Sequence, residues 1–175
     1  MEISSKPKSV FVTVGTTSFD ELIGFVLEKK FLRMLEEKGY SKVTLQIGHG
    51  TEPSIPKSNI LVEWYRLKNS ISNDILSSSL IISHAGAGSC LEILEKQKPL
   101  IVVVNPSLMN NHQVEFASKL HQEGHVHMCN PETLYITLAE NNLNTIRSYH
   151  TLPCKSSELS NKIIDLMQIG LKDFS

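Results

Sequence analysis

Short runs of β-branched and aliphatic residues alternate with amphipathic stretches along the chain, and this alternation constrains the fold more than any other feature. The amphipathic stretches place apolar residues at helical spacing, as at Leu22, Phe25, Val26 and Leu32 in a stretch that ends near Gly39. The aliphatic runs predict strands at 10–14, 43–47, 60–64, 80–83, 100–104 and 125–128. Strands joined by helices form a mostly parallel sheet with helices on both faces, so the sequence predicts a Rossmann-like α/β fold.

Length and composition limit the range of functions that the chain can have. The 175 residues suit one domain, 1–175, of the usual size of about 100–200 residues. Because 17 Lys and Arg nearly balance 18 Asp and Glu, we expect no nucleic-acid partner. No apolar run reaches the ~18–20 residues of a membrane span, and residues 1–9 lack the apolar core of a secretory signal. The widely spaced Cys90, Cys129 and Cys154 suggest neither disulfides nor a zinc pair, so we expect a soluble, cytoplasmic protein.

The segments that follow the strands are the candidate binding residues, because parallel α/β sheets bind ligands beyond the carboxyl ends of their strands. Gly15, Thr16 and Thr17 follow the first strand and suit an anion, although an ordinary turn with a threonine helix cap fits equally well. Residues 83–89 (SHAGAGS) lead from a buried strand through two glycines into a helix. Their backbone amides and the helix dipole form a cradle for a diphosphate, without the lysine of a P-loop or the Gly-x-Gly-x-x-Gly pattern.

Other polar residues lie in the same predicted region. Glu92, one turn into the helix, either accepts hydrogen bonds from ribose hydroxyls or complements the helix dipole. His84 is either a residue beside the ligand or a partly buried structural histidine. Asn111, His112 and Gln113 begin the helix after the fifth strand and suit sugar hydroxyls, while an N-cap with an exposed first turn is the plainer alternative.

Three further observations bear on the chemistry. Trp64 and Tyr65 end the third strand, where one aromatic ring either stacks on a base or closes the core. Cys90 has no base near it in the sequence, so we assign it to packing. The chain contains no Asp-x-Asp pair, so we expect no metal ion on the diphosphate and predict no cofactor.

Three segments carry a resemblance to a known family: 11–20 (FVTVGTTSFD), 83–92 (SHAGAGSCLE) and 110–113 (NNHQ). In this order they resemble the catalytic subunit of the asparagine-linked-glycosylation N-acetylglucosaminyltransferase, which adds the second GlcNAc to GlcNAc-diphosphate-dolichol from UDP-GlcNAc. The likeness runs from the first strand to about residue 124. More distantly, the chain is similar to the donor-binding C-terminal half of the bacterial lipid-linked peptidoglycan GlcNAc transferase, a two-domain GT-B enzyme.

The resemblance implies an inverting, β-1,4 transfer that requires a membrane-anchored partner subunit. That partner recruits the chain to the cytosolic face of the endoplasmic reticulum and presents the dolichol-linked acceptor. The resemblance also assigns roles: Gly86, Ala87, Gly88 and Ser89 hold the diphosphate, Glu92 binds ribose, His112 and Gln113 contact GlcNAc, and Gly15, Thr16 and Thr17 border the cleft. The general base stays open between His84, His112 and a residue of the partner. An apolar helix expected at 157–171 docks either on the partner or on its own sheet.

Two other functions fit the same residues. A non-catalytic UDP-sugar-binding module, acting as a regulator or scaffold, would use the cradle without transferring anything. A self-contained Rossmann enzyme would be active as an isolated chain and would accept other nucleotides.

Overall fold

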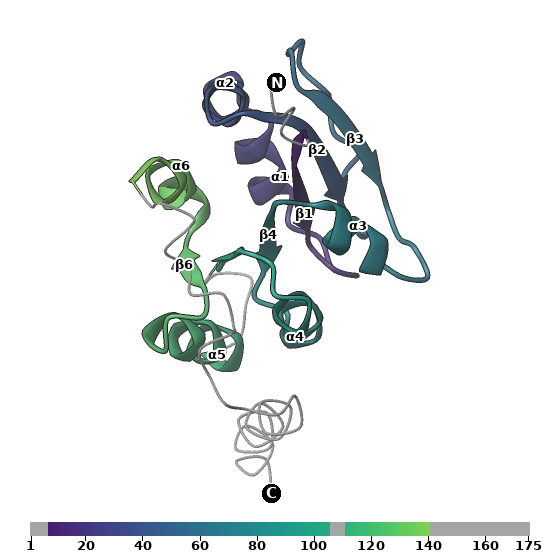
Figure 1. Cartoon of the computed structure of the whole chain (residues 1–175). Coiled ribbons are helices and arrows are strands. Elements are labelled where there is room, and N and C mark those ends of the chain that lie inside the picture. Colours follow the sequence, from purple (N-terminus) through teal and green to yellow (C-terminus); the bar gives the residue numbers. More distant parts are fainter. Residues whose placement is uncertain (1–6, 106–110, 141–175) are drawn as a thin grey trace, which may run out of the picture.

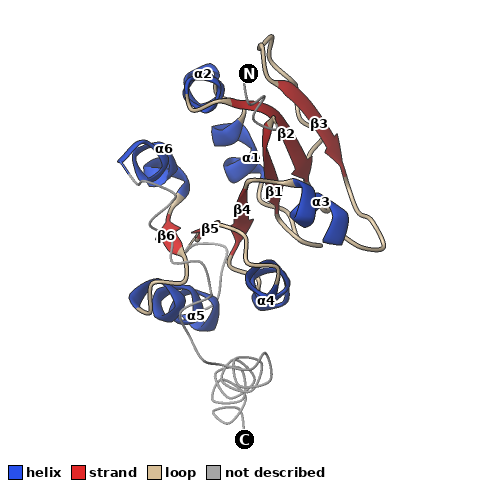
Figure 2. Ribbon diagram, viewed as in Figure 1, coloured by secondary structure: helices blue, strands red, loops and turns tan. Residues whose placement is uncertain are grey.

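Six parallel strands form one sheet in the computed structural model, which describes residues 7–105 and 111–140 (Figure 2). The strands are β1 (Lys8–Thr13), β2 (Tyr40–Gln46), β3 (Leu61–Tyr65), β4 (Leu80–His84), β5 (Leu100–Val103) and β6 (His127–Cys129). Their order across the sheet is β3-β2-β1-β4-β5-β6, and each pair of neighbours is parallel. The predicted Rossmann-like sheet is confirmed, with several strand ends shifted by a few residues.

Helices cover both faces of the sheet (Figure 1). One core holds residues of α1 (Asp20–Val26), α2 (Lys29–Glu37) and α6 (Pro131–Glu140), and a second core holds residues of α3 (Ser72–Ser77), α4 (Ala87–Glu95) and α5 (Asn111–Gln122). Along β1, Val10 and Val12 belong to the first core and Phe11 to the second, because strand side chains point alternately to the two faces. All residues of β4 and β5 are buried, as expected for central strands of a parallel sheet.

The topology brings the two predicted anion-binding segments together. From β1 the chain proceeds outward to β3, then crosses back to β4 and continues to β6. β1 and β4 are therefore neighbours, with Thr13 opposite Ser83 at their carboxyl ends. The segments after these strands lead into α1 and α4, which pack on opposite faces. This is the switch point at which doubly wound sheets bind ligands.

The stretch expected as one helix ending near Gly39 is two helices, because its apolar residues change phase. Leu27 is the C-cap of α1, and Glu28 is the N-cap of α2 with an extended conformation (φ −60°, ψ 136°). In one continuous helix, Phe31 would lie about half a turn around the axis from Leu22, at about 100° per residue. Both side chains are nevertheless buried in the same core. The break at Leu27 and Glu28 turns both apolar faces toward the sheet.

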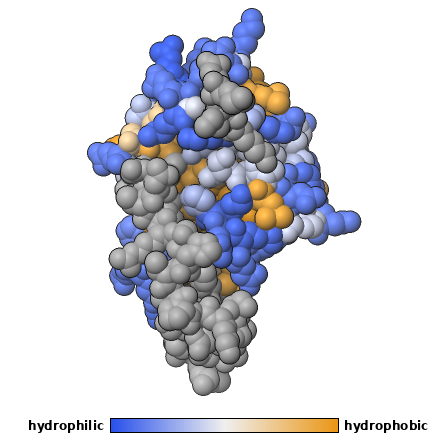
Figure 3. Space-filling view, in the orientation of Figure 1, coloured by the Kyte–Doolittle hydropathy of each residue, from blue (hydrophilic) through white to orange (hydrophobic). Residues whose placement is uncertain are grey.

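The helix expected at 157–171 lies outside the described residues. Within residues 7–105 and 111–140, none of the helices combines the length and apolar character of a membrane span. On the face seen in Figure 3, apolar residues form small separate patches among hydrophilic ones.

Candidate functional site

His84 fills the space between the two loops at the switch point. A Cβ atom added to Gly15 would lie 2.8 Å from His84 Cε1, and one added to Gly86 would overlap His84 Nε2. The imidazole ring therefore lies between the β1–α1 loop and the start of α4. Gly15 also has φ +64°, a conformation that residues with a side chain rarely adopt. The two glycines thus create the room that the ring occupies.

The His84 side chain is enclosed but lacks a partner for one nitrogen. The residue is 7% exposed, and His84 Nδ1 is buried without a hydrogen-bond partner. Burial lowers the pKa of His84 below its ordinary value, and the Thr13 backbone partly offsets this effect. The backbone of His84 is well held, since Ser83 Oγ donates to the His84 carbonyl oxygen at 2.9 Å and Cys90 Sγ donates to it at 3.6 Å.

The start of α4 offers backbone amides and open space. Gly86 is the N-cap and no side chain caps the helix, whose first backbone bond runs from Cys90 N to Gly86 O at 3.0 Å. The amides of Ala87, Gly88 and Ser89 precede that bond and so have no partner within the helix. A Cβ atom on Gly88 would meet no atom within 4 Å. The helix entrance therefore combines an electropositive backbone with room for a ligand.

The β1–α1 loop is shaped by its own contacts rather than by a threonine cap. The Thr13 hydroxyl donates to Gln46 Oε1 on β2 and accepts from Gly15 N at 3.0 Å. Thr17 Oγ1 donates to the Val14 carbonyl oxygen at 2.9 Å, whereas the N-cap of α1 is Phe19 and no side chain caps the helix. The threonine cap considered from the sequence is therefore wrong, and Thr16 and Thr17 stay exposed at the sheet edge.

The turn after β2 is hydrogen-bonded to the β1–α1 loop and to the start of α1. The sequence did not predict these contacts. His49 N donates to the Thr17 carbonyl oxygen at 2.9 Å, and Thr51 N donates to Asp20 Oδ1 at 3.0 Å. Gly48 has φ +54°, and a Cβ atom there would overlap the Thr17 carbonyl oxygen. The glycines flanking His49 in the sequence indicated a turn, but its docking partner is about 30 residues away and leaves no local pattern.

A second contact that the sequence did not predict joins α1 to the residue that follows β5. Asn105, which follows β5 and is 7% exposed, donates from Nδ2 to Glu21 Oε2 on α1 at 2.7 Å. This bond links α1 to the end of β5 at the edge where the predicted binding segments lie.

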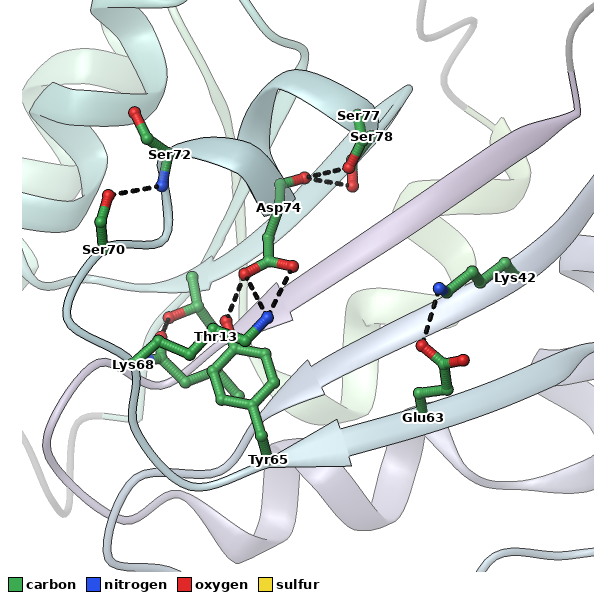
Figure 4. Close-up of polar contacts among 11 residues, drawn as sticks. Thr13, Lys42, Glu63, Tyr65, Lys68, Ser70, Ser72, Asp74, Ser77 and Ser78 are labelled. Atoms are coloured by element: carbon green, nitrogen blue, oxygen red, sulfur yellow. Dashed lines mark hydrogen bonds and ion pairs between the residues drawn. The ribbon is translucent and has the colours of Figure 1, made fainter.

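The β3–α3 connection is held by a polar cluster, shown in Figure 4. Tyr65 Oη donates to Asp74 Oδ2 at 2.8 Å, and Lys68 Nζ binds the same carboxylate at 2.9 Å while lying 3.8 Å from the centre of the Tyr65 ring. Burial and the hydrogen bond to Asp74 raise the pKa of Tyr65. Trp64 packs against the first core and Tyr65 against the second, so the core-closing alternative applies to these aromatic rings.

The remaining residues predicted for the site differ in their burial and in their contacts. Glu92 Oε1 lies 3.4 Å from Lys96 Nζ, one helical turn further along α4. His112 and Gln113 lie in the first turn of α5, with His112 exposed and Gln113 half-buried. The side chain of Asn111 lies outside the described residues. Cys90 is fully buried, and burial raises its pKa to about 12, in line with the assigned packing role.

Other features of the surface do not coincide with this edge. A hollow of about 860 Å³ is lined by α2, residues 57–59 and Tyr135, and another of about 400 Å³ by α1 and residues 51–56. Across the described ranges, no three His, Cys, Asp or Glu side chains are grouped to hold a metal ion.

Comparison with solved structures defines the class of fold. The chain matches the NMR solution structure of ALG13 with a TM-score of 0.67 and 26% identity, over 87% of this chain and 93% of that one. It matches Acinetobacter baumannii MurG with a TM-score of 0.64 and 17% identity, over 95% of this chain and 51% of that one. It matches the kitacinnamycin glycotransferase with a TM-score of 0.60 and 18% identity, over 94% of this chain and 41% of that one. The fold is a Rossmann-like half of the GT-B architecture.

The sequence match then gives the family. Residues 9–167 match the Glycosyltransferase family 28 C-terminal domain, and the chain belongs to this family. Similar curated proteins are named UDP-N-acetylglucosamine transferase subunit ALG13. The human one is 55% identical over 124 residues, which are 70% of this chain and 11% of that protein. The Saccharomyces cerevisiae one is 33% identical over 160 residues, 71% of this chain and 78% of that protein. The chain thus spans about a tenth of the human relative.

Proposed function

We propose that this chain is the catalytic, donor-binding subunit of a glycosyltransferase that moves GlcNAc from UDP-GlcNAc to GlcNAc-diphosphate-dolichol. Membership of family 28 and the name of the relatives support a UDP-GlcNAc transferase. The observation that carries the proposal is the uncapped start of α4, with open space at Gly88, beside the β1–α1 loop. A helix entrance of this kind binds the phosphates of a nucleotide.

The proposed binding roles are supported by the meeting of these segments at one edge of the sheet. The amides of Gly86, Ala87, Gly88 and Ser89 hold the diphosphate, and Gly15, Thr16 and Thr17 border it from β1. Glu92 binds the ribose hydroxyls after leaving Lys96, because an exposed ion pair of this kind contributes only about 0–1 kcal/mol. Asn111, His112 and Gln113, at the start of α5, contact the hydroxyls of GlcNAc.

The reaction is an inverting displacement. The 4-hydroxyl of the acceptor sugar attacks C1 of the donor, its proton passes to a base, and UDP leaves. The amides at the start of α4 stabilise the negative charge on the departing diphosphate, and loss of such donors typically costs about 10²–10³ in rate. His84 is only 7% exposed, so we favour His112 or a residue of the partner as the base.

The word subunit in the names of the relatives supports a second polypeptide. In the GT-B architecture a second half faces the carboxyl ends of the donor-side strands. We propose that this half is a membrane-anchored protein that brings the chain to the cytosolic face of the endoplasmic reticulum and binds the dolichol-linked acceptor.

Substitution of Gly88 tests the proposed site. Gly88→Val fills the open space at the entrance of α4, so we expect UDP-GlcNAc affinity to fall by about 100-fold or more, about 2.7 kcal/mol, in isothermal titration calorimetry. Valine is no worse than glycine within a helix, so the fold should be retained. Gly24→Val is the matched control, because Gly24 also lies in a helix with no atom within 4 Å of an added Cβ. Equal donor affinity for wild type and Gly88→Val would refute the site.

A further inference from the structure

Two hollows adjoin on one face of the molecule, away from the proposed donor site. Both are lined by the α1–α2 stretch and by residues 51–59, which belong to the connection from β2 to β3. Glu28 and Pro56 line the smaller hollow, and the next residues along the chain, Lys29 and Lys57, line the larger one. The two hollows are therefore consecutive parts of one groove, whose two ends we call the smaller and the larger half.

Hydrogen bonds hold the walls of this groove together in both halves. In the smaller half, Thr51 N donates to Asp20 Oδ1 at 3.0 Å. In the larger half, Asn59 Nδ2 donates to Glu36 Oε1 at 2.8 Å. The groove is thus a preformed surface that a partner meets without first ordering the chain.

The two halves carry opposite charge. Three carboxylates line the smaller half, and among the described residues no Lys or Arg does: Asp20, Glu28 and Glu52. Four cations and two carboxylates line the larger half: Lys29, Lys30, Arg33 and Lys57 with Glu36 and Glu37. We therefore call them the acidic half and the basic half.

Several of these charges are available to a partner. Glu52 in the acidic half and Lys29, Arg33 and Lys57 in the basic half are exposed. Within residues 7–105 and 111–140 they make no hydrogen bond or ion pair. Lys30, by contrast, pairs with Glu28 at 3.0 Å.

A groove that is acidic at one end and basic at the other is complementary to itself. A two-fold axis through the junction of the halves turns a second copy end for end, so that each acidic half faces a basic half. An anionic membrane or an acidic peptide would be repelled by the acidic half, and a basic partner would be repelled by the basic half. The charge pattern therefore fits a second copy of this chain better than it fits a partner of one sign.

Exposed apolar side chains border the groove. Ile55 lies on the wall of the acidic half and is 39% exposed. Tyr135 lines the basic half, is 38% exposed and has Lys30 Nζ 5.7 Å from the centre of its ring. Apolar and aromatic anchors of this kind add affinity to contacts between charges.

We propose that two copies of this chain associate through the groove about a two-fold axis, with the acidic half of each against the basic half of the other. The inference is independent of the proposed transfer reaction. α4 packs on the opposite face of the sheet from α1 and α2, so the start of α4 stays accessible in both copies. Because exposed charges dominate the contact, the pair is weak and sensitive to salt.

Analytical ultracentrifugation of the full-length chain tests the inference. We expect a monomer–dimer equilibrium from micromolar to millimolar protein in about 0.05 M salt. In about 1 M salt the equilibrium should shift to monomer, because screening over about 3 Å weakens contacts between exposed charges. Wild type that stays monomeric throughout this range at low salt would overturn the proposal.

Reversal of charge in each half gives the decisive arm. Lys29→Glu with Lys57→Glu makes both halves acidic, and Glu28→Lys with Glu52→Lys makes both halves basic. Each double variant alone should dissociate at least about tenfold more readily than wild type, because like charges then face each other. An equimolar mixture of the two should associate again, since every contact in the mixed pair joins an acidic half to a basic half.

Controls separate this pattern from a general effect of charge. Lys42→Glu with Lys119→Glu changes the net charge as much as the first variant does, outside the groove, and should dimerise as wild type does. Urea denaturation checks the fold of each variant, and Glu52→Lys alone replaces the second variant if that one does not fold.

Three results would contradict the proposal. Variants that dimerise as strongly as wild type would place the contact elsewhere, and a mixture that stays monomeric would refute the two-fold arrangement. A monomeric wild type that sediments with vesicles containing phosphatidylserine would assign the basic half to a membrane surface instead.

Discussion

The glycines of the α4 entrance have different roles, although they look alike in the sequence. Gly86 has ordinary dihedral angles (φ −76°, ψ 118°) that any residue adopts, but a Cβ atom there would overlap His84 Nε2. Gly88 faces open space instead. In the sequence both glycines read as parts of one cradle. Their roles differ because of the rotamer of His84, two residues before Gly86, which no local pattern shows.

A double-mutant cycle tests this distinction. Gly86→Ala should destabilise the protein by about 1–3 kcal/mol, the usual cost of overpacking, because the new methyl group meets the His84 ring. In a His84→Ala background the same substitution should cost much less, giving a coupling energy of at least about 1 kcal/mol. The free energy of unfolding is measured by urea denaturation. If the effects of the two substitutions on stability are additive, the His84 ring is not the reason why position 86 requires a glycine.

At the level of elements, the local sequence pattern predicts whether a segment forms a helix or a strand. It does not predict which distant residues that segment contacts. The strand and helix periodicities predicted the β-α alternation correctly. The division between α1 and α2 also has a sequence signature, the change of phase between Leu22 and Phe31. The docking of the 48–51 turn on the β1–α1 loop and the bond between Asn105 and Glu21 join residues far apart in the chain. Only the assembled sheet brings these partners together.

The end of α3 is also held by a residue from a different part of the chain. Lys98 Nζ donates to the carbonyl oxygens of Leu76 at 2.7 Å and Ser78 at 2.9 Å, which complements the negative end of this short helix. Lys98→Met should reduce stability by about 1 kcal/mol, since these partly exposed bonds involve a charged donor. It should also accelerate hydrogen exchange of the amides at 72–79. Lys96→Met, which removes only the ion pair with Glu92, should change stability by less than about 0.5 kcal/mol.

At the scale of the whole molecule, the order of the strands brings the predicted binding segments together. Residues 15–17 and 86–89 are about 70 positions apart in the sequence, and they meet because β1 and β4 are neighbours. Parallel pairing and right-handed crossovers make that arrangement predictable from the β-α alternation. The candidate residues on α5 were predicted on the same basis, and the side chains at 106–111 lie outside the described part of the chain.

The proposed division of labour between two polypeptides predicts how activity is distributed. The chain alone should bind UDP-GlcNAc yet transfer no labelled GlcNAc to GlcNAc-diphosphate-dolichol, because one Rossmann-like half supplies only the donor side of a GT-B cleft. Transfer should begin when the chain is co-expressed with its membrane-bound partner, and Gly88→Val should abolish it while Gly24→Val does not. Normal donor binding without transfer in the presence of the partner would favour a non-catalytic UDP-sugar-binding module. Transfer by the isolated chain would instead identify a self-contained enzyme, because the acceptor would then need no second subunit.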